Sequence, residues 1–146
     1  MSMIFRKMRD EDLDAVYMIE KASFSEPWLR EFFENELKYD SYVVVLNNEI
    51  IGYICTMQVL DECTITNISV RQDFRRQGIA GYIFKNLFDV MDQRNVKYYY
   101  LEVRESNEAA LKLYYRLGFF EIGTRKDYYR NPLEDAKVMT LSRNLE

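Results

Sequence analysis

Residues 64–103 read TITNISVRQDFRRQGIAGYIFKNLFDVMDQRNVKYYYLEV, and this stretch decides the fold class. Its two ends, residues 64–70 and 98–103, are rich in β-branched and aromatic side chains and predict strands. The second of these runs is apolar on both faces, which is typical of a buried central strand. Between them, apolar side chains at helical spacing predict a helix over residues 78–93: Ile79, Ile83, Leu87 and Met91, with Phe84 and Phe88 alongside. A strand, a helix and a strand in this order predict a βαβ crossover with parallel pairing.

The N-terminal part is expected to add a strand and two helices. Residues 3–8 predict the strand, and Asp10 is expected to cap a helix whose acidic first turn suits its positive end. The segment Ser25-Glu26-Pro27 interrupts this helix. Pro27 suits the first turn of a second helix that runs through Leu37.

Two hairpins are expected to complete the sheet. Residues 42–46 and 50–59 flank Asn47-Asn48-Glu49, a turn signal because Asn tolerates left-handed backbone. A helix over residues 107–117 is expected to end at Gly118, and residues 119–125 and 137–143 predict the last hairpin. The fold class is therefore mixed α/β, with one layer of sheet and helices on its faces.

Length and composition restrict the class of protein. The chain has 146 residues, which predicts a single domain over 1–146. It carries 24 acidic and 20 basic residues, a net charge of −4, which argues against a general nucleic-acid binder but leaves room for a local basic patch. There is no histidine, which excludes Ser-His-Asp and Cys-His catalysis and His-ligated zinc, and we expect no metal.

Cysteine usage and the distribution of apolar residues indicate the cellular compartment in which the protein is found. Cys55 and Cys63 form neither a CxxC pair nor a disulfide framework, so a reducing compartment fits best. Charged residues occur within the first few positions, and no apolar core of a signal peptide is present there. The longest apolar runs are only as long as a strand and too short for a membrane-spanning helix. We therefore expect a cytoplasmic protein that does not associate with a membrane.

One segment has the properties of an anion site. Between the strand ending at Val70 and the next helix lie three arginines (Arg71, Arg75 and Arg76) and three small residues (Gly78, Ala80 and Gly81). Small residues admit a ligand close to the backbone, and a helix N-terminus attracts phosphate. The alternative is a solvated basic turn with glycines chosen for packing. The position within a βαβ unit favours phosphate, although neither G-x-G-x-x-G nor a P-loop is present.

The motifs resemble one enzyme family over about residues 3–141. Residues 75–80, RRQGIA, resemble the acetyl-CoA signature Q/R-x-x-G-x-G/A of the GNAT acetyltransferase superfamily. The strings LEVRESNEAA (101–110) and LYYRLGF (113–119) resemble the RimI-type N-terminal acetyltransferases, as do NISV (67–70) and FSEPW (24–28). This resemblance implies a GNAT-like fold, a mixed and mostly antiparallel sheet with one splayed parallel pair and helices on both faces.

The resemblance also implies where acetyl-CoA binds. The pantetheine arm would lie in the splayed gap, along the strand edge formed by Ile68, Ser69 and Val70. The helix start would hold the pyrophosphate through Arg76, Gln77, Gly78, Ile79, Ala80 and Gly81. Asn107 would give the cofactor a hydrogen bond, although from the residues alone Asn107 is equally a helix N-cap, and it can serve as both.

Two catalytic residues follow from the same resemblance. Glu102 would be the general base, acting through water, and Tyr114 would protonate the departing thiolate. From the residues alone, Glu102 could equally be paired with an arginine, and Tyr114 could be an aromatic packed at helical spacing. Asn107 and Tyr114 lie seven residues apart and so face one side of their helix. The cysteines are expected to have no catalytic role.

The acceptor is expected to be a free α-amino group of a protein or peptide, ribosomal and nascent chains included, attacked directly in a ternary complex. By resemblance, Phe24, Glu26, Pro27, Tyr128 and Tyr129 would flank it, with Glu26 attracting the ammonium; each residue also has an ordinary packing or helix-start explanation. Some archaeal and eukaryotic relatives carry a histidine on the strand over 64–70, so its absence places more weight on Glu102. Two alternatives remain open: acetylation of a small amine or lysine side chain, and a non-catalytic acetyl-CoA sensor.

Overall fold

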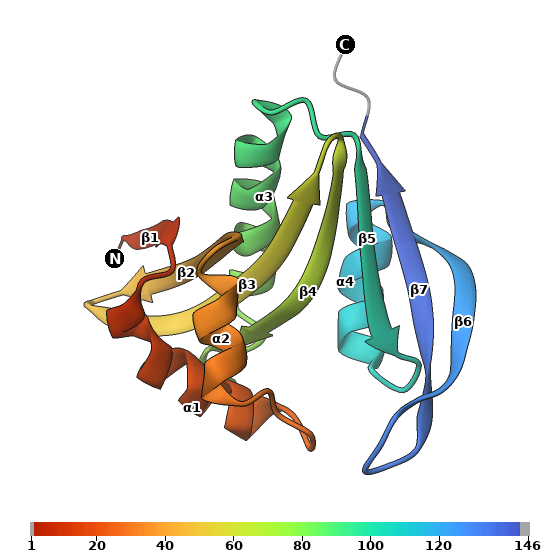
Figure 1. Ribbon diagram of the computed structural model, residues 1–146, viewed down its shortest axis with the longest axis horizontal. Coiled ribbons are helices and arrows are strands. Elements are labelled where there is room, and N and C mark those ends of the chain that lie inside the picture. Colours follow the sequence, from red (N-terminus) through yellow and green to blue (C-terminus); the bar gives the residue numbers. More distant parts are fainter. Residues whose placement is uncertain (1, 144–146) are drawn as a thin grey trace.

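The computed structural model describes residues 2–143, which contain one seven-stranded sheet in the order β1-β2-β3-β4-β5-β7-β6 (Figure 1). Only β4 and β5 pair in parallel; the other neighbours are antiparallel. The strands are β1 Met3–Lys7, β2 Asp40–Leu46, β3 Glu49–Val59, β4 Glu62–Val70, β5 Tyr98–Arg104, β6 Phe120–Tyr129 and β7 Glu134–Ser142. The α-helices are α1 Leu13–Ser23, α2 Arg30–Glu36, α3 Ile79–Asp92 and α4 Glu108–Leu117.

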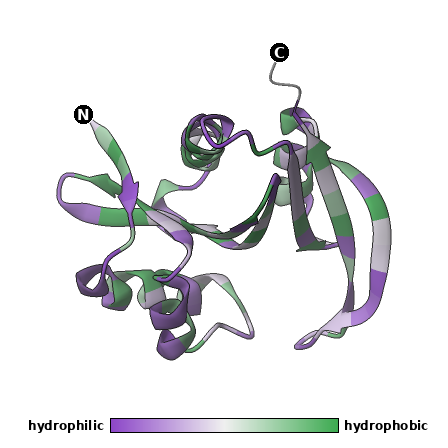
Figure 2. Ribbon diagram, turned by 45° about the horizontal axis from the view of Figure 1, so that its top comes forward, coloured by the Kyte–Doolittle hydropathy of each residue, from purple (hydrophilic) through white to green (hydrophobic). Residues whose placement is uncertain are grey.

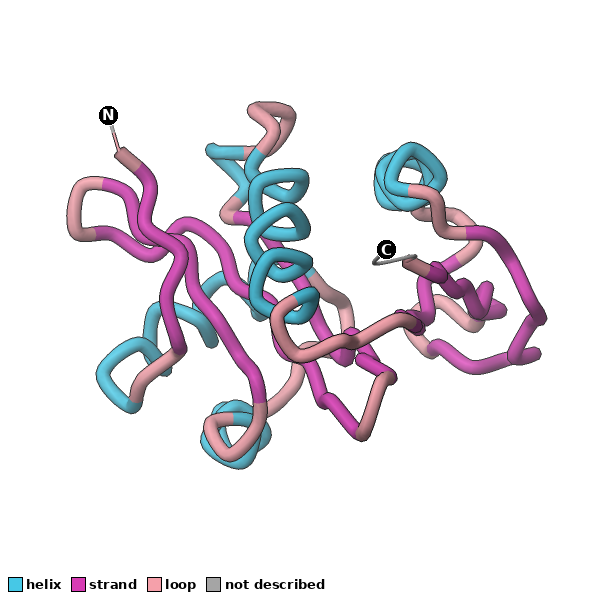
Figure 3. The backbone as a smooth tube through the Cα atoms, turned by 90° about the horizontal axis from the view of Figure 1, so that it is seen from above, coloured by secondary structure: helices cyan, strands magenta, loops and turns pink. Residues whose placement is uncertain are grey.

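The helices cover both faces of the sheet. Helices α1 and α2 lie on one face, and α3 and α4 lie on the other (Figures 2 and 3). Under α3 and α4 the larger core cluster includes Ile83, Phe84 and Leu101, and under α1 and α2 a smaller one includes Phe33 and Tyr53. Within the described residues, no helix combines the length and apolar character that crossing a bilayer requires.

The predicted crossover and hairpin turn are confirmed. Helix α3 connects β4 to the parallel strand β5, and it places its apolar stripe in the core. At the first hairpin, Asn47 and Asn48 have φ angles of 50° and 64°, the left-handed conformation that the turn requires. Gly118 follows α4 with φ of 102°, so that the N–H of Phe119 reaches the carbonyl of Tyr114.

Two predicted helix starts are wrong. Asp10 does not cap α1, because residues 10–12 form a 3₁₀ turn and α1 begins at Leu13. The buried carboxylate in that turn is Asp12, which accepts the N–H of Arg9 and pairs with Arg6 at 2.7 Å. Pro27 is not in the first turn of α2, which begins at Arg30, because the N–H of Trp28 is bound by a side chain of α1 and the connection stays extended up to Leu29.

The parallel pair opens along its length. Strands β4 and β5 pair only from Glu62 to Thr64 against Tyr98 to Tyr100, and beyond that point they diverge (Figure 1). Strand β5 instead keeps its pairing with β7 from Tyr98 to Arg104. A bulge places Thr66 as an extra residue in β4, since Cys55 pairs with Asn67 and Thr56 with Ile65. The result is a gap between residues 65–70 and 101–104.

The prediction that β5 is buried on both faces is wrong. Its alternate side chains Tyr99, Leu101 and Val103 are buried in the core under α3 and α4. On the opposite face Glu102 and Arg104 are only half-buried, since they border the gap. The apolar run Tyr98–Leu101 concealed this alternation, and Tyr98 is 40% exposed.

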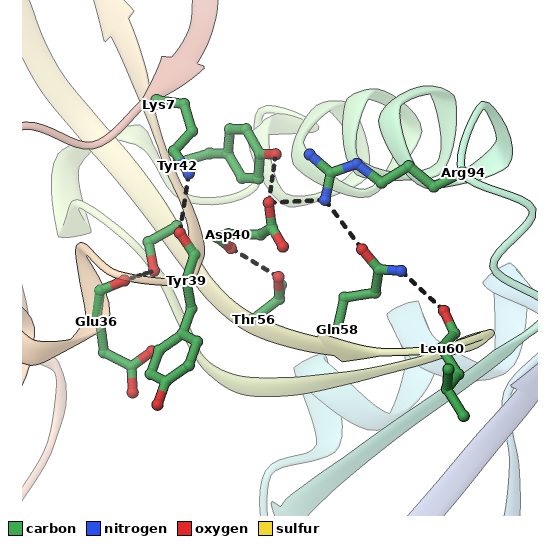
Figure 4. Close-up of polar contacts among 10 residues, drawn as sticks. Lys7, Glu36, Tyr39, Asp40, Tyr42, Thr56, Gln58, Leu60 and Arg94 are labelled. Carbon is green, nitrogen blue, oxygen red and sulfur yellow. Dashed lines mark hydrogen bonds and ion pairs between the residues drawn. The ribbon is translucent and has the colours of Figure 1, made fainter.

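A polar cluster fastens the end of the sheet where β4 and β5 remain paired (Figure 4). Arg94, between α3 and β5, donates to Asp40 at 2.8 Å and to Gln58 at 3.1 Å. Thr56 donates to the backbone carbonyl of Asp40 at 2.6 Å. These bonds connect the start of β2, the end of β3 and the turn before β5, so the sheet opens at its other end.

Glu36, the last residue of α2, provides a test of buried charge. Its Oε2 atom is buried and accepts no hydrogen bond within residues 2–143, and burial raises the pKa of the carboxyl group. The pKa of Glu36 is higher in the folded protein than in the unfolded chain. As pH rises from the unfolded pKa through the folded pKa, this group therefore lowers the free energy of unfolding. We expect Glu36→Gln to raise Tm at pH 7.5 by about 1–2 °C, a value discounted for partial solvent screening.

The measurement is scanning calorimetry of both proteins at pH 7.5 and at pH 4. The difference in Tm is expected to shrink at pH 4, where wild-type Glu36 is largely protonated. An unchanged or lower Tm for the variant at pH 7.5 would show that the buried oxygen carries no cost.

Candidate active-site cleft

A cleft of about 540 Å³ opens where β4 and β5 part. Its walls come from the end of α1 and the α1–α2 connection, from β4 and β5, from the start of α4 and from the β6–β7 connection. Seven residues singled out from the sequence line it together: Phe24, Glu26, Ile68, Glu102, Asn107, Tyr114 and Tyr129. The fold therefore gathers segments from residue 24 to residue 129 around one space.

The other predicted site residues lie outside this cleft. Ser69 and Val70 continue β4, residues 76–81 form the turn into α3, Pro27 is half-buried beside the cleft, and Tyr128 is exposed on β6. Trp28, which was quoted with the α1–α2 connection, also lines the cleft. Sequence reasoning gave no role to several other lining residues, among them Glu20, Ser25, Asn67, Arg104 and Glu134. Glu20 had a usable signal, because it follows Val16 by four residues on the buried side of α1, where a carboxylate is rare.

Beyond Thr64, the edge of β4 that faces the gap has no strand partner within residues 2–143. The N–H of Arg71 donates to Ile51 of β3, and alternate residues of an antiparallel ladder point to the same partner, so Ser69 also faces β3. The backbone groups of Ile68 and Val70 therefore point the other way, toward the gap. Arg75 Nε donates to the Val70 carbonyl at 3.0 Å.

The turn into α3 leaves space at its backbone. Gly78 precedes the helix with φ of 78°, and a Cβ placed on Gly78 or Gly81 would meet nothing within 4 Å. Arg71 is held by Asp73 at 2.8 Å, whereas the Arg76 side chain forms no hydrogen bond or ion pair with residues 2–143. Exposed helix N–H groups beside two open glycines suit a phosphate group, so these residues fit the pyrophosphate role that the resemblance implies.

Glu102 has an arginine partner and also borders the cleft. Arg125 Nε of β6 lies 2.8 Å from Glu102 Oε2, an ion pair whose geometry makes no hydrogen bond. The carboxylate also lines the cleft. Glu102 therefore has an arginine partner and faces the space in which a substrate would lie.

Tyr114 combines core packing with access to the cleft. Its ring packs against Phe84 and Phe119, with centroids 5.9 and 5.8 Å away, and the residue is 6% exposed. Burial, with a smaller effect of Tyr129, raises the pKa of its hydroxyl, which is therefore protonated at neutral pH. Asn107 caps α4 by accepting the N–H of Ala110 at 3.2 Å, and it lines the same cleft, as the seven-residue spacing predicts.

One arginine binds the β6–β7 connection, and this connection is bonded in turn to the α1–α2 connection. Arg104, at the end of β5, donates to the carbonyls of Arg130 and Pro132 at 2.7 and 3.0 Å and to Glu134 at 3.1 Å. Its guanidinium also lies over the Tyr129 ring, 4.5 Å from the centroid. Across the cleft, Glu26 Oε1 accepts the N–H of Arg130 at 2.7 Å, so the α1–α2 and β6–β7 connections are bonded to each other.

The charge of the cleft is predominantly negative. Four carboxylates line it: Glu20, Glu26, Glu102 and Glu134. Arg104 is the only cationic side chain in the lining within residues 2–143. Such a surface attracts a cationic group such as an ammonium.

Neither cysteine offers its thiol to the cleft. Cys55 and Cys63 are free, fully buried and absent from the cleft lining. Burial raises the pKa of the Cys63 thiol to about 12, and that of Cys55 also upward, so neither is a thiolate nucleophile at neutral pH.

Comparison with known proteins establishes the family. Residues 13–119 match the acetyltransferase (GNAT) family. The chain belongs to this family. It is 35% identical over 143 residues, 95% of both chains, to a putative [ribosomal protein bS18]-alanine N-acetyltransferase of Bacillus subtilis strain 168. It is 37% identical over 134 residues to the [ribosomal protein bS18]-alanine N-acetyltransferase of Escherichia coli K12, covering 89% of this chain and 90% of that protein.

Solved structures agree with this GNAT fold. The crystal structure of the ribosomal-protein-S18-alanine N-acetyltransferase from Escherichia coli superposes with a TM-score of 0.90 at 34% identity, covering 97% of this chain and 94% of that one. Ard1 from Thermoplasma volcanium gives a TM-score of 0.93 at 21% identity and 99% coverage of each chain, a likeness of fold alone.

The Arg104 contacts lead to a prediction about loop order. We expect Arg104→Gln to increase amide hydrogen exchange over residues 127–134 by about tenfold or more, because two backbone carbonyls and Glu134 lose their charged donor. The measurement is exchange followed by mass spectrometry, with Arg116→Gln on the exposed side of α4 as the matched control. Equal exchange in both variants would mean that the loop keeps its place without Arg104.

Proposed function

We propose that this GNAT protein is an N-α-acetyltransferase that moves the acetyl group of acetyl-CoA to the free α-amino group of a protein or peptide N-terminus. The observation that carries the proposal is the β4–β5 gap, which places Glu102, Tyr114 and the unpaired edge of β4 around one cleft. The identity with two bS18-alanine N-acetyltransferases over most of the chain supports it.

The proposed acetyl-CoA site follows the edge of β4 into α3. Ile68 and Val70 would bond the pantetheine arm through backbone groups, with Ser69 between them. Arg76 and residues 77–81 would hold the pyrophosphate, where Ile79 contributes its N–H because its side chain is buried. The side-chain amide of Asn107 would add a hydrogen bond from the start of α4. When bound, acetyl-CoA supplies an acetyl thioester.

The proposed chemistry uses protons held at two side chains. Glu102 takes the proton from the acceptor ammonium through a water molecule, which leaves a neutral amine as nucleophile. Backbone N–H groups at Ile68 and Val70 stabilise negative charge on the carbonyl oxygen. The amine nitrogen attacks the thioester carbon, and the new C–N bond gives a tetrahedral intermediate. As this intermediate collapses, the C–S bond breaks, the Tyr114 hydroxyl gives its proton to the sulfur, and the second proton lost by the nitrogen returns to Tyr114 through water. No group of the protein is acetylated on the way.

The proposed acceptor site lies between the two bonded loops. Phe24, Glu26 and Pro27 would flank the acceptor on one side, and Tyr128 and Tyr129 on the other. The negative lining favours an ammonium group. The two relatives, [ribosomal protein bS18]-alanine N-acetyltransferases, point to an alanine of a ribosomal protein as the acceptor. We place the enzyme in the cytoplasm, without a direct nucleic-acid or membrane partner.

Acceptor class is tested by measuring CoA release with a peptide panel. We expect turnover with peptides that carry a free N-terminal amine, and none with the same peptides blocked at the N-terminus and containing an internal lysine. Turnover of blocked lysine peptides or of polyamines would favour the second enzyme class. Acetyl-CoA binding without any turnover would favour the sensor.

The two catalytic roles make a separate prediction. We expect Glu102→Gln and Tyr114→Phe each to lower kcat by about 10²–10³-fold, because each removes one proton transfer. The Kd for acetyl-CoA should change by less than about threefold, since neither side chain is needed to hold the cofactor. Steady-state kinetics and calorimetry check both numbers. An unaltered kcat in Glu102→Gln would remove Glu102 as the base.

A further inference from the structure

Glu20 is a buried carboxylate that none of these roles uses. It lies in the last turn of α1, is 2% exposed and lines the cleft. It accepts hydrogen bonds from three different elements: the N–H of Trp28 at 2.8 Å, the side-chain amide of Asn67 at 2.7 Å, and the hydroxyl of Tyr53. A single side chain therefore joins the α1–α2 connection to β3 and β4.

The charge of Glu20 has no cationic partner. Glu102 and Glu134 pair with Arg125 and Arg104, but no lysine or arginine within residues 2–143 forms an ion pair with Glu20. Tyr53 is a donor here, because burial and the nearby Glu20 raise the pKa of its hydroxyl. Burying a carboxylate among neutral donors costs more than burying a neutral side chain of similar shape, so stability alone gives no account of it.

Glu20 acts at the junction of the two proposed substrate sites. Its partner Asn67 directly precedes Ile68, whose backbone faces the gap. One turn along α1, Ser23 Oγ lies 2.7 Å from Ser69 Oγ. Trp28 ends the segment that would flank the acceptor. A shift of this segment relative to β4 would therefore displace the side chains that would flank the acceptor and weaken acceptor binding.

We propose that Glu20 is the positioning residue of the acceptor site, which holds residues 24–28 against β4 and adds uncompensated negative charge beside the incoming ammonium. This inference rests on the proposed function. It assigns acceptor binding to a residue of α1, while proton transfer stays with Glu102 and Tyr114.

The test compares two identical chemical changes. Glu20→Gln keeps the shape but removes the charge and one acceptor atom, and Glu36→Gln makes the same change at a glutamate that does not line the cleft. We expect Glu20→Gln to raise KM for an N-terminal peptide by about tenfold or more, with kcat and KM for acetyl-CoA within about threefold of wild type. Glu36→Gln should leave all three constants unchanged.

A second readout follows the loop without using catalysis. Trp28 is the only tryptophan of the chain, so its fluorescence reports on this segment. We expect a red-shifted emission and stronger acrylamide quenching in Glu20→Gln, and none in Glu36→Gln. Asn67→Ala removes one donor to Glu20 and should change the fluorescence and the peptide KM in the same direction by smaller amounts. This variant provides the test if Glu20→Gln fails to fold.

Each outcome separates this inference from the proposed function. An unchanged peptide KM, or a fall in kcat alone, in Glu20→Gln would overturn the positioning role while wild-type turnover still supports the acetyltransferase. Unchanged Trp28 fluorescence in both Glu20→Gln and Asn67→Ala would overturn it as well. Absence of wild-type turnover with every peptide would overturn the proposed function, and with it the acceptor role of Glu20.

Discussion

The end of pairing between β4 and β5 after Thr64 is the constraint on which the site depends. Parallel strands usually remain paired, because separated edges leave backbone N–H and C=O groups without partners. Here β5 continues along β7, and β4 along β3, so each strand keeps one full ladder when the other is lost. The separation therefore removes only the hydrogen bonds between the facing edges of β4 and β5. An extended ligand can pair with the backbone of those edges.

The bulge at Thr66 divides the chemistry between the two faces of the sheet. Before it, Cys63 and Ile65 face the core under α3; after it, Ile68 and Val70 do so, and Asn67 and Ser69 turn to the face under α1. On β5, Glu102 and Arg104 share that second face. The apolar face thus anchors Tyr114 through its ring, whereas the polar face gathers the carboxylates. The Tyr114 ring and the carboxylates therefore reach the cleft from opposite faces of the sheet.

How far the sequence predicts this arrangement depends on the range of the interactions. Local signals sufficed for α3, for the Asn47-Asn48 turn and for Gly118, because spacing and backbone preference act within a few residues. The extent of the β4–β5 gap could not be predicted from the residues, since the length of a strand pairing depends on contacts between segments far apart in the sequence. Arg125 as the partner of Glu102 was equally out of reach, because the pair joins β5 to β6, which are separated in the sheet by β7. Motif resemblance located Asn107 and Glu102, but not Glu20, which lies outside the quoted strings.

The end of the cleft that is proposed for the acceptor is bordered by loops whose backbone is bound by side chains of α1, β5 and the loops themselves. Arg104 donates to the carbonyls of Arg130 and Pro132. Glu26 accepts the N–H of Arg130, and Glu20 accepts the N–H of Trp28. Such bonds fix a loop at a few points without burying it, so the exposed side chains of Phe24 and Tyr128 remain available. A loop packed into a core would be more stable but could not present them. Because Glu20 lies on α1 and Arg104 on β5, regular elements set the positions of both loops and therefore of the cleft walls that these loops form.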